Sequence, residues 1–339
     1  MLTWTLAGRW RGKVLARPIL GTCFLVAASG MAEERALEAG PGASAYGGVT
    51  ALEGAAAVLG DQARRELPEM VLVADLSRAA ALMARWLGEN ATSTLPTDLV
   101  DFSLRWAGCA DPSAVSVAVL STESSPGELW QRVRELRAAG SVGTYWGFGE
   151  SESRLPPYRT SWVALLSERK LELDTIPRRA ESGASLALRG HWTGAGLGTP
   201  VVVVQSPGGT LQRPSAVPVA GGFAADIGPF REPGEHVLEV MGEGRYGPEV
   251  AALLTIWVDT APTASWRPRR EPAPAGTSAM EVEVLLLDWT NEARRLRGLM
   301  PLTLDARLQA LARAHSADMA EAGFFGHTSP RSGGFESRF

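Results

Sequence analysis

The sequence predicts an α+β protein of several domains, because its hydrophobic patterning changes twice along 339 residues. Residues 71–180 mix helical spacing with short apolar runs, and residues 184–260 alternate β-rich runs with Gly/Pro turns, typical of an antiparallel β-sandwich. Residues 280–339 return to helical spacing. The length agrees with two or three domains.

Composition excludes several classes of protein. Hydrophobic residues make up 45% and charged residues 21%, enough to build cores and too apolar for a disordered chain. The formal net charge of −4 argues against a nucleic-acid partner, since binding phosphates needs a basic surface. No apolar run reaches eighteen residues, so we expect no transmembrane span.

Residues 1–32 have the pattern of a signal peptide. A ten-residue apolar core, Ile19 to Ala28, follows a basic stretch and precedes small residues, with cleavage expected after Gly30 or Ala32. We therefore expect a protein that is secreted, extracellular or held at the cell envelope. An uncleaved anchor or a cytosolic helix is the alternative. Residues 33–70, rich in Ala, Gly and Glu, are expected to form a flexible lead-in.

Residues 71–180 predict a mixed α/β domain of unknown role. Helical spacing runs from Asp75 to Gly88, and a second helix should start at Ser125–Glu128, with the serine as its cap. Strands are expected at Val115–Leu120, Val142–Gly149 and Trp162–Leu166. Once the signal is removed, Cys109 is the one remaining cysteine and is expected to be a small buried apolar residue.

Residues 184–260 contain five short β-rich runs separated by turns, and they resemble the immunoglobulin-like modules of secreted bacterial proteins. Gly242–Gly247 matches G-x-G-x-x-G, but a β-like run follows instead of a helix. A hairpin turn is therefore favoured over a nucleotide site. His191 and His236 are isolated here and are expected at the surface or a strand edge.

Residues 261–279 hold four prolines and predict a linker. Two helices follow, from Glu281 to Arg297 and from the capping residue Asp305 to about Ala322. The second helix should carry one apolar face that includes a packed histidine, made of Leu308, Leu311, Ala312, His315 and Met319.

Short motifs then follow one another in order through the two helices and the loop after them. They are Asn291-x-x-Arg294, Gly298-Leu299-x-Pro301-Leu302, Asp305-x-x-Leu308, Ala314-His315-Ser316-x-Asp318-Met319 and Phe325-x-His327-x-Ser329-Pro330. Together they resemble the opening half of a CAP domain, the superfamily of cysteine-rich secretory, antigen 5 and pathogenesis-related proteins, in its bacterial secreted branch.

The resemblance implies an α-β-α sandwich with a cleft that holds two histidines and two acidic residues, and in some members a divalent metal. His327 matches the first of these histidines. The family's second histidine and its Gly-Glu-Asn motif have no counterpart before Phe339. Residues 280–339 are therefore expected to be a partial, truncated CAP domain.

On this basis His327 is the expected binding-cleft residue. No catalytic residue is identified, and neither a cofactor nor a metal site is expected in this chain, since one imidazole is too few ligands for zinc. The favoured function is non-enzymatic binding of an extracellular or cell-envelope ligand that the sequence does not identify. The alternatives are a metal-assisted, peptidase-like hydrolase that uses a complete CAP cleft, and an adhesive or structural surface protein.

Overall fold

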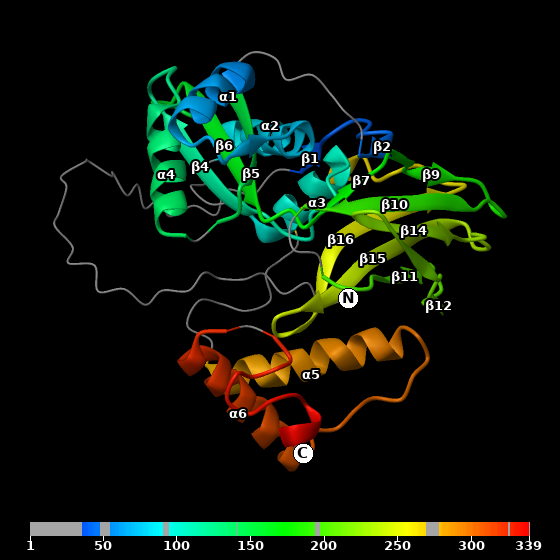
Figure 1. The fold of residues 1–339 in the computed structure, drawn as a ribbon. Helices are drawn as coiled ribbons and strands as arrows, with labels where there is room; N and C mark the ends of the chain where they lie inside the picture. The colour runs from blue at the N-terminus through cyan, green and yellow to red at the C-terminus, as the bar shows by residue number, and fades with distance from the viewer. Residues whose placement is uncertain are drawn as a thin grey trace. The chain divides into compact units, whose positions relative to one another are not determined.

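The computed structural model describes residues 36–47, 55–90, 95–140, 142–193, 197–268, 278–324 and 326–338 (Figure 1). The expected signal peptide lies outside these ranges. The chain divides into two compact units, one of Met1–Glu243 with Glu249–Pro268 and the other of Gly244–Pro248 with Arg269–Phe339. No helix in the described ranges is long and apolar enough to cross a membrane.

The first unit begins with an α/β lobe built on a four-stranded sheet, in the order β3 (Val71–Leu72), β5 (Tyr145–Glu152), β6 (Thr160–Ser167), β4 (Val115–Ser121). The β3–β5 pair is parallel and the other two pairs are antiparallel. Strands β4, β5 and β6 confirm the three strands that the apolar runs predict in this region.

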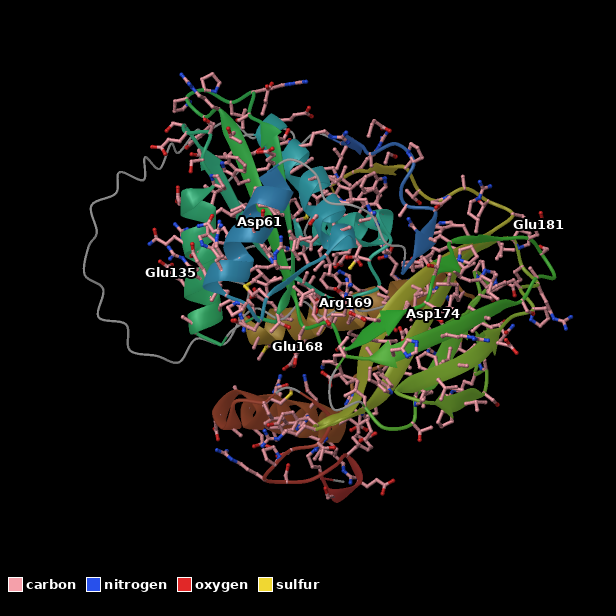
Figure 2. All side chains as sticks on the ribbon, turned by 45° about the horizontal axis from the view of Figure 1, so that its top comes forward. Asp61, Glu135, Glu168, Arg169, Asp174 and Glu181 are labelled. Atoms are coloured by element: carbon pink, nitrogen blue, oxygen red, sulfur yellow. The ribbon has the colours of Figure 1, made fainter. Side chains whose placement is uncertain are left out.

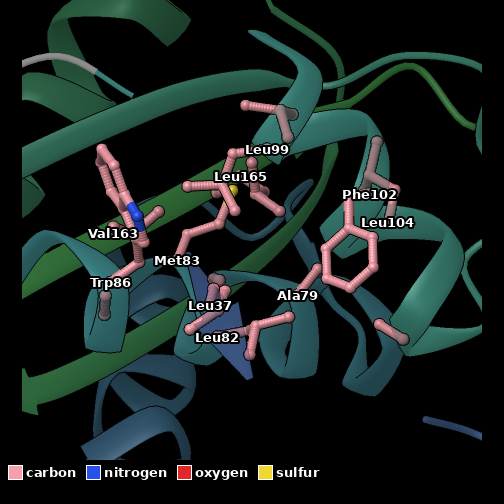
Figure 3. Packing of buried hydrophobic residues seen from close by; sticks show 14 of the residues in the cluster. Leu37, Ala79, Leu82, Met83, Trp86, Leu99, Phe102, Leu104, Val163 and Leu165 are labelled. Carbon is pink, nitrogen blue, oxygen red and sulfur yellow. The ribbon is translucent and has the colours of Figure 1, made fainter. Parts of the chain in front are cut away.

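Helices cover both faces of this sheet (Figure 1). One face packs on α2 (Ala74–Glu89) and α3 (Thr97–Ala107), the other on α1 (Ala55–Glu66) and α4 (Gly127–Ala138). Strand β6 shows why: Val163 and Leu165 join the α2–α3 core, while Trp162 and Ala164 join the α1–α4 core. Figure 3 shows Val163 and Leu165 among the side chains of the α2–α3 core.

Two glycines let α2 lie directly on β5. A side chain at Gly147 would meet the Leu76 backbone carbon at 2.2 Å, and one at Gly149 would meet the Ala81 nitrogen at 2.1 Å. These are closer than real side-chain atoms come, so larger residues there would push the helix off the sheet. The other side of the same strand carries large rings, Trp146 and Phe148.

Helix starts and ends follow local signals only in part. Helix α2 agrees with the expected span, but α3 was not anticipated. Helix α4 begins where expected, yet its N-cap is Pro126, with no side-chain capping bond, so the proposed Ser125 cap is wrong. Cys109 is buried as expected, and burial raises the pKa of its thiol well above the ordinary value.

The second lobe of this unit consists of two sheets around one apolar core (Figure 1). One has the order β13 (Ala216–Val219), β14 (Gly222–Ile227), β10 (Leu186–Trp192), β7 (Leu171–Leu173). The other has the order β12 (Leu211–Gln212), β11 (Val201–Gln205), β15 (Gly234–Gly244), β16 (Gly247–Val258), β9 (Arg179–Ala180). The strands expected from 184–260 are present, and that this β lobe is immunoglobulin-like stays a prediction.

The β lobe also takes in residues expected to belong to the α/β domain. Strands β7 and β9 fall within 171–180 and pair with β10 and β16, respectively. His236, expected at the surface or a strand edge, is 2% exposed and lies edge-on to the Phe230 ring, 5.1 Å between centroids. Burial lowers the pKa of His236 below its ordinary value. His191 is exposed, as expected.

The expected lead-in is ordered where the structure describes it. Strand β1 (Leu37–Glu38) pairs with β17 (Ser265–Trp266), and β2 (Ala45–Tyr46) pairs with β8 (Ile176–Pro177). Tyr46 is fully buried, and its hydroxyl accepts a hydrogen bond from the Thr255 amide at 2.8 Å. The expected flexible lead-in is therefore wrong at Leu37–Glu38 and Ala45–Tyr46, which lie in paired strands. The expected linker is wrong at Ser265–Trp266, which forms the partner strand of β1.

Two arginines, the buried Arg178 and the half-buried Arg169, connect the lobes of this unit. Arg178, between β8 and β9, donates to the carbonyls of Ala43 at 2.7 Å and Trp106 at 2.9 Å, and stacks over the rings of Tyr46 and Trp257. Arg169, labelled at the junction of the lobes in Figure 2, binds the Asp111 carboxylate through two nitrogens, at 2.9 and 3.0 Å.

Arg169 also donates to Asp75 at 2.7 Å, at the first turn of α2. Its burial acts to lower the pKa of the guanidinium, but the carboxylates of Asp111 and Asp75 outweigh this effect and raise it. Asp111 is itself buried. The charges are thus paired where they are desolvated, as burial requires.

We predict that Arg178→Ala lowers the free energy of unfolding by about 2–4 kcal/mol, since it removes two charged hydrogen bonds, leaves the Ala43 carbonyl without this donor and removes the cation from the Tyr46 and Trp257 rings. The matched control is Arg179→Ala, which changes the exposed neighbouring arginine and should cost less than about 0.5 kcal/mol. Denaturant unfolding of the full chain, followed by tryptophan fluorescence, measures both. Equal losses in the two variants would contradict this assignment.

Candidate functional site

The second unit contains two capped helices. Helix α5 (Ala279–Arg295) begins at Ser278, which forms a reciprocal capping box with Glu281. Helix α6 (Ala306–Ala322) begins at Asp305, whose carboxylate accepts from the amides of Arg307 at 2.8 Å and Leu308 at 3.1 Å. Gly323 ends it in the left-handed conformation, at φ +66°. Both helices therefore confirm the expected spans within two residues.

A carboxylate joins the two helices. Glu283 on α5 accepts two hydrogen bonds from Arg313 on α6, at 2.6 and 2.7 Å, and a third from Gln309 at 2.6 Å. The bonds from Arg313 and Gln309 lower the pKa of Glu283. Neither helix contains a buried residue, so the stripe expected on α6 is not a buried face in the described structure.

Asn291 and Arg294, the residues of the first motif, bind the loop between the two helices. Asn291 uses both ends of its amide on Leu302, donating to the carbonyl at 2.9 Å and accepting from the N–H at 2.6 Å. Arg294 donates to the Met300 carbonyl at 2.6 Å, and Gly298 lies at φ +65°, which favours glycine. Asn291 and Arg294 therefore shape this loop.

Asp318 on α6 organises the turn that follows His327. Its carboxylate accepts from the hydroxyls of Ser329 and Ser332, and the Arg331 guanidinium lies 3.6 Å away. The buried Ser329 oxygen in turn accepts from the amides of Arg331 and Ser332, each at 3.0 Å. One carboxylate oxygen of Asp318, Oδ2, is thus engaged within the turn, and the other lies near Arg331.

His315 is half-buried and hydrogen-bonded, in agreement with a packing role. Its Nε2–H donates to the Gly326 carbonyl at 2.9 Å, because a carbonyl can only accept. Its ring lies 5.9 Å from that of Phe324, which is 5% exposed. This contact fixes the start of the loop that leads to His327.

His327 itself is exposed. The Arg338 guanidinium donates to its backbone carbonyl at 3.1 Å, so the main chain of this residue is held while its side chain faces solvent. In the described ranges no group of three or more His, Cys, Asp or Glu side chains is placed to hold a metal ion. His327 can therefore offer a ligand one imidazole, as donor or acceptor, and the metal of some CAP proteins lacks a fitting ligand set among the described residues.

Comparison with known proteins gives matches over the same region. The profile of the family described as "CAP: Cysteine-rich secretory protein family" matches residues 287–339. "Uncharacterized protein YkwD" of Bacillus subtilis (strain 168) is 44% identical over 61 residues, which cover 18% of this chain. The match spans 23% of the length of that relative.

Among solved structures, a DUF4785 family protein from Legionella pneumophila matches 32% of this chain and 34% of its own, at 10% identity. The TM-score of 0.21 is too low to support an inference about the fold.

We predict that the full chain shows no zinc site dependent on His327, since structural and catalytic zinc need about three or four protein ligands. Calorimetric zinc titrations of wild type and His327→Ala should agree, with His191→Ala as a control for the other exposed histidine. Micromolar binding in wild type that disappears only in His327→Ala would contradict this prediction.

Proposed function

We propose that the protein, whose residues 287–339 match the CAP family, is a secreted or envelope-associated, non-enzymatic binding protein whose contact residue is His327. The observation behind this proposal is that His327 differs from the other motif residues in its surroundings. Asn291, Asp318 and His315 are engaged in hydrogen bonds within their own unit, whereas the His327 ring faces solvent.

Binding is favoured over hydrolysis by the chemistry available at His327. A hydrolase of this kind needs a metal or a general base oriented by a second group. The nearest acidic motif residue, Asp318, is bound to two serines and lies close to an arginine. A lone exposed imidazole suits recognition of a polar ligand.

Export is the second part of the proposal, and it is supported by the N-terminal sequence pattern. The basic stretch, the short apolar core and the small residues after it are those of a cleavable signal. An extracellular or envelope location would put the binding unit where a wall or surface ligand is available.

We expect the mature chain to begin near Glu33 when the gene is expressed in a secreting bacterium. N-terminal sequencing of the exported protein measures this directly. The control is a form in which Leu25 and Val26 in the apolar core are replaced by Asp, because charge there should abolish export. Intact Met1 in a soluble cytosolic protein would contradict export.

For binding, we expect the mature protein to co-sediment with bacterial cell envelopes from which the proteins have been removed. His327→Ala should weaken this binding by about tenfold, the effect of losing one hydrogen bond of roughly 1.4 kcal/mol. The matched control is His191→Ala, which removes an exposed histidine from the first unit and should bind like wild type.

Two results would reject the binding proposal. Release of soluble fragments from the envelopes in a His327-dependent manner would establish the hydrolase alternative. Binding that is equal in wild type and His327→Ala would assign it elsewhere, as in the adhesive alternative.

A further inference from the structure

The turn between β15 and β16 belongs to the second unit, which comprises Gly244–Pro248 together with Arg269–Phe339. This turn is the G-x-G-x-x-G sequence that first suggested a glycine-rich hairpin. Its two central residues, Arg245 and Tyr246, separate the strands.

Tyr246 completes a row of three rings inside this unit. The centroid of its ring lies 5.3 Å from that of Phe324, and Phe324 lies 5.9 Å from His315. Neither α5 nor α6 has a buried residue. Phe324, in contact with the rings of Tyr246 and His315, is buried. Tyr246 therefore covers the apolar side chain that begins the His327 loop.

Backbone contacts of the same turn reach both sides of His327. The Thr328 amide donates to the Tyr246 carbonyl at 2.9 Å. On the other side, a Cβ placed on Gly326 would meet the Tyr246 Cβ at 2.4 Å and its carbonyl oxygen at 2.7 Å. Gly326 is thus a glycine because Tyr246 lies against it.

Gly247 brings the turn against His327 itself. A Cβ on Gly247 would lie 3.3 Å from the His327 Cβ, and the residue is buried. Its φ of +107° is a conformation that other residues rarely adopt. The turn therefore approaches Phe324, Gly326, His327 and Thr328.

We propose that Tyr246 is a positioning residue for His327, and that the β15–β16 turn is an added wall of the candidate binding site. The ring of Tyr246 holds Phe324, and its carbonyl holds Thr328, so the backbone that carries His327 is held from both sides. The ligand-binding role of His327 rests on the proposed function, but its positioning by Tyr246 is independent of any ligand.

Histidine-selective NMR of the full chain tests the positioning, because the sequence has only four histidines. Tyr246→Ala should move the ring signals of His327 and His315, while those of His191 and His236 stay unchanged and report that the first unit is folded. Tyr246→Phe keeps the ring and the carbonyl, so it should restore the wild-type signals. His→Gln variants assign each signal.

Gly326→Ala provides a second test from the other side of the contact. The added methyl should displace the loop from Tyr246 and move the same two signals. The matched control is Gly334→Ala in the same segment, where a Cβ meets nothing within 4 Å. Unchanged His327 signals in both Tyr246→Ala and Gly326→Ala would overturn the proposal.

The envelope assay separates this inference from the function on which it builds. If His327 binds a ligand, Tyr246→Ala should weaken co-sedimentation about as much as His327→Ala, and Tyr246→Phe should bind like wild type. If wild type does not bind at all, the proposed function fails while the NMR result still decides the role of Tyr246. Binding that is lost equally in Tyr246→Ala and Tyr246→Phe would overturn positioning by the ring.

Discussion

The burial of charge at the junction of the two lobes is the constraint on which the first unit depends. Arg178 is 1% exposed, and its donors reach carbonyls of the N-terminal segment and the end of α3, while its face covers Trp257 of the β lobe. A desolvated guanidinium without these partners would be costly. The two lobes must therefore meet in the arrangement that supplies them, and Arg169 with its paired aspartates restricts the α/β side in the same way.

In the first unit, a strand from the beginning of the described chain also pairs with one that follows the β lobe. Strand β1 lies near the start of the described residues and pairs with β17, which follows the whole β lobe. Trp266 of β17 then packs edge-on to Trp86 of α2, with centroids 5.7 Å apart. The first and last strands of the described part of the first unit are thus joined to each other.

The second unit is built differently: helices α5 and α6 contain no buried residue, and side-chain hydrogen bonds join its described segments. The motif residues that it shares with the CAP family act mainly as a frame: Asn291 shapes one loop, and Asp318 shapes the turn beyond His327. Such a frame holds the segments before and after the exposed His327. Tyr246, which lies outside residues 287–339, adds its ring contact with Phe324 to this frame.

The sequence by itself determined the local features of this protein: the apolar run that forms β6, the caps at Asp305 and Gly323, and the ordered motifs that predict the CAP segment and single out His327. These signals act within a few residues along the chain. Only the tertiary structure decided the strand pairing of Leu37–Glu38 and Ala45–Tyr46, the burial of His236 and the contact of Tyr246 with Phe324. Each of these depends on a partner far away in the sequence, and neither hydrophobic periodicity nor capping carries information about which distant segment will supply it.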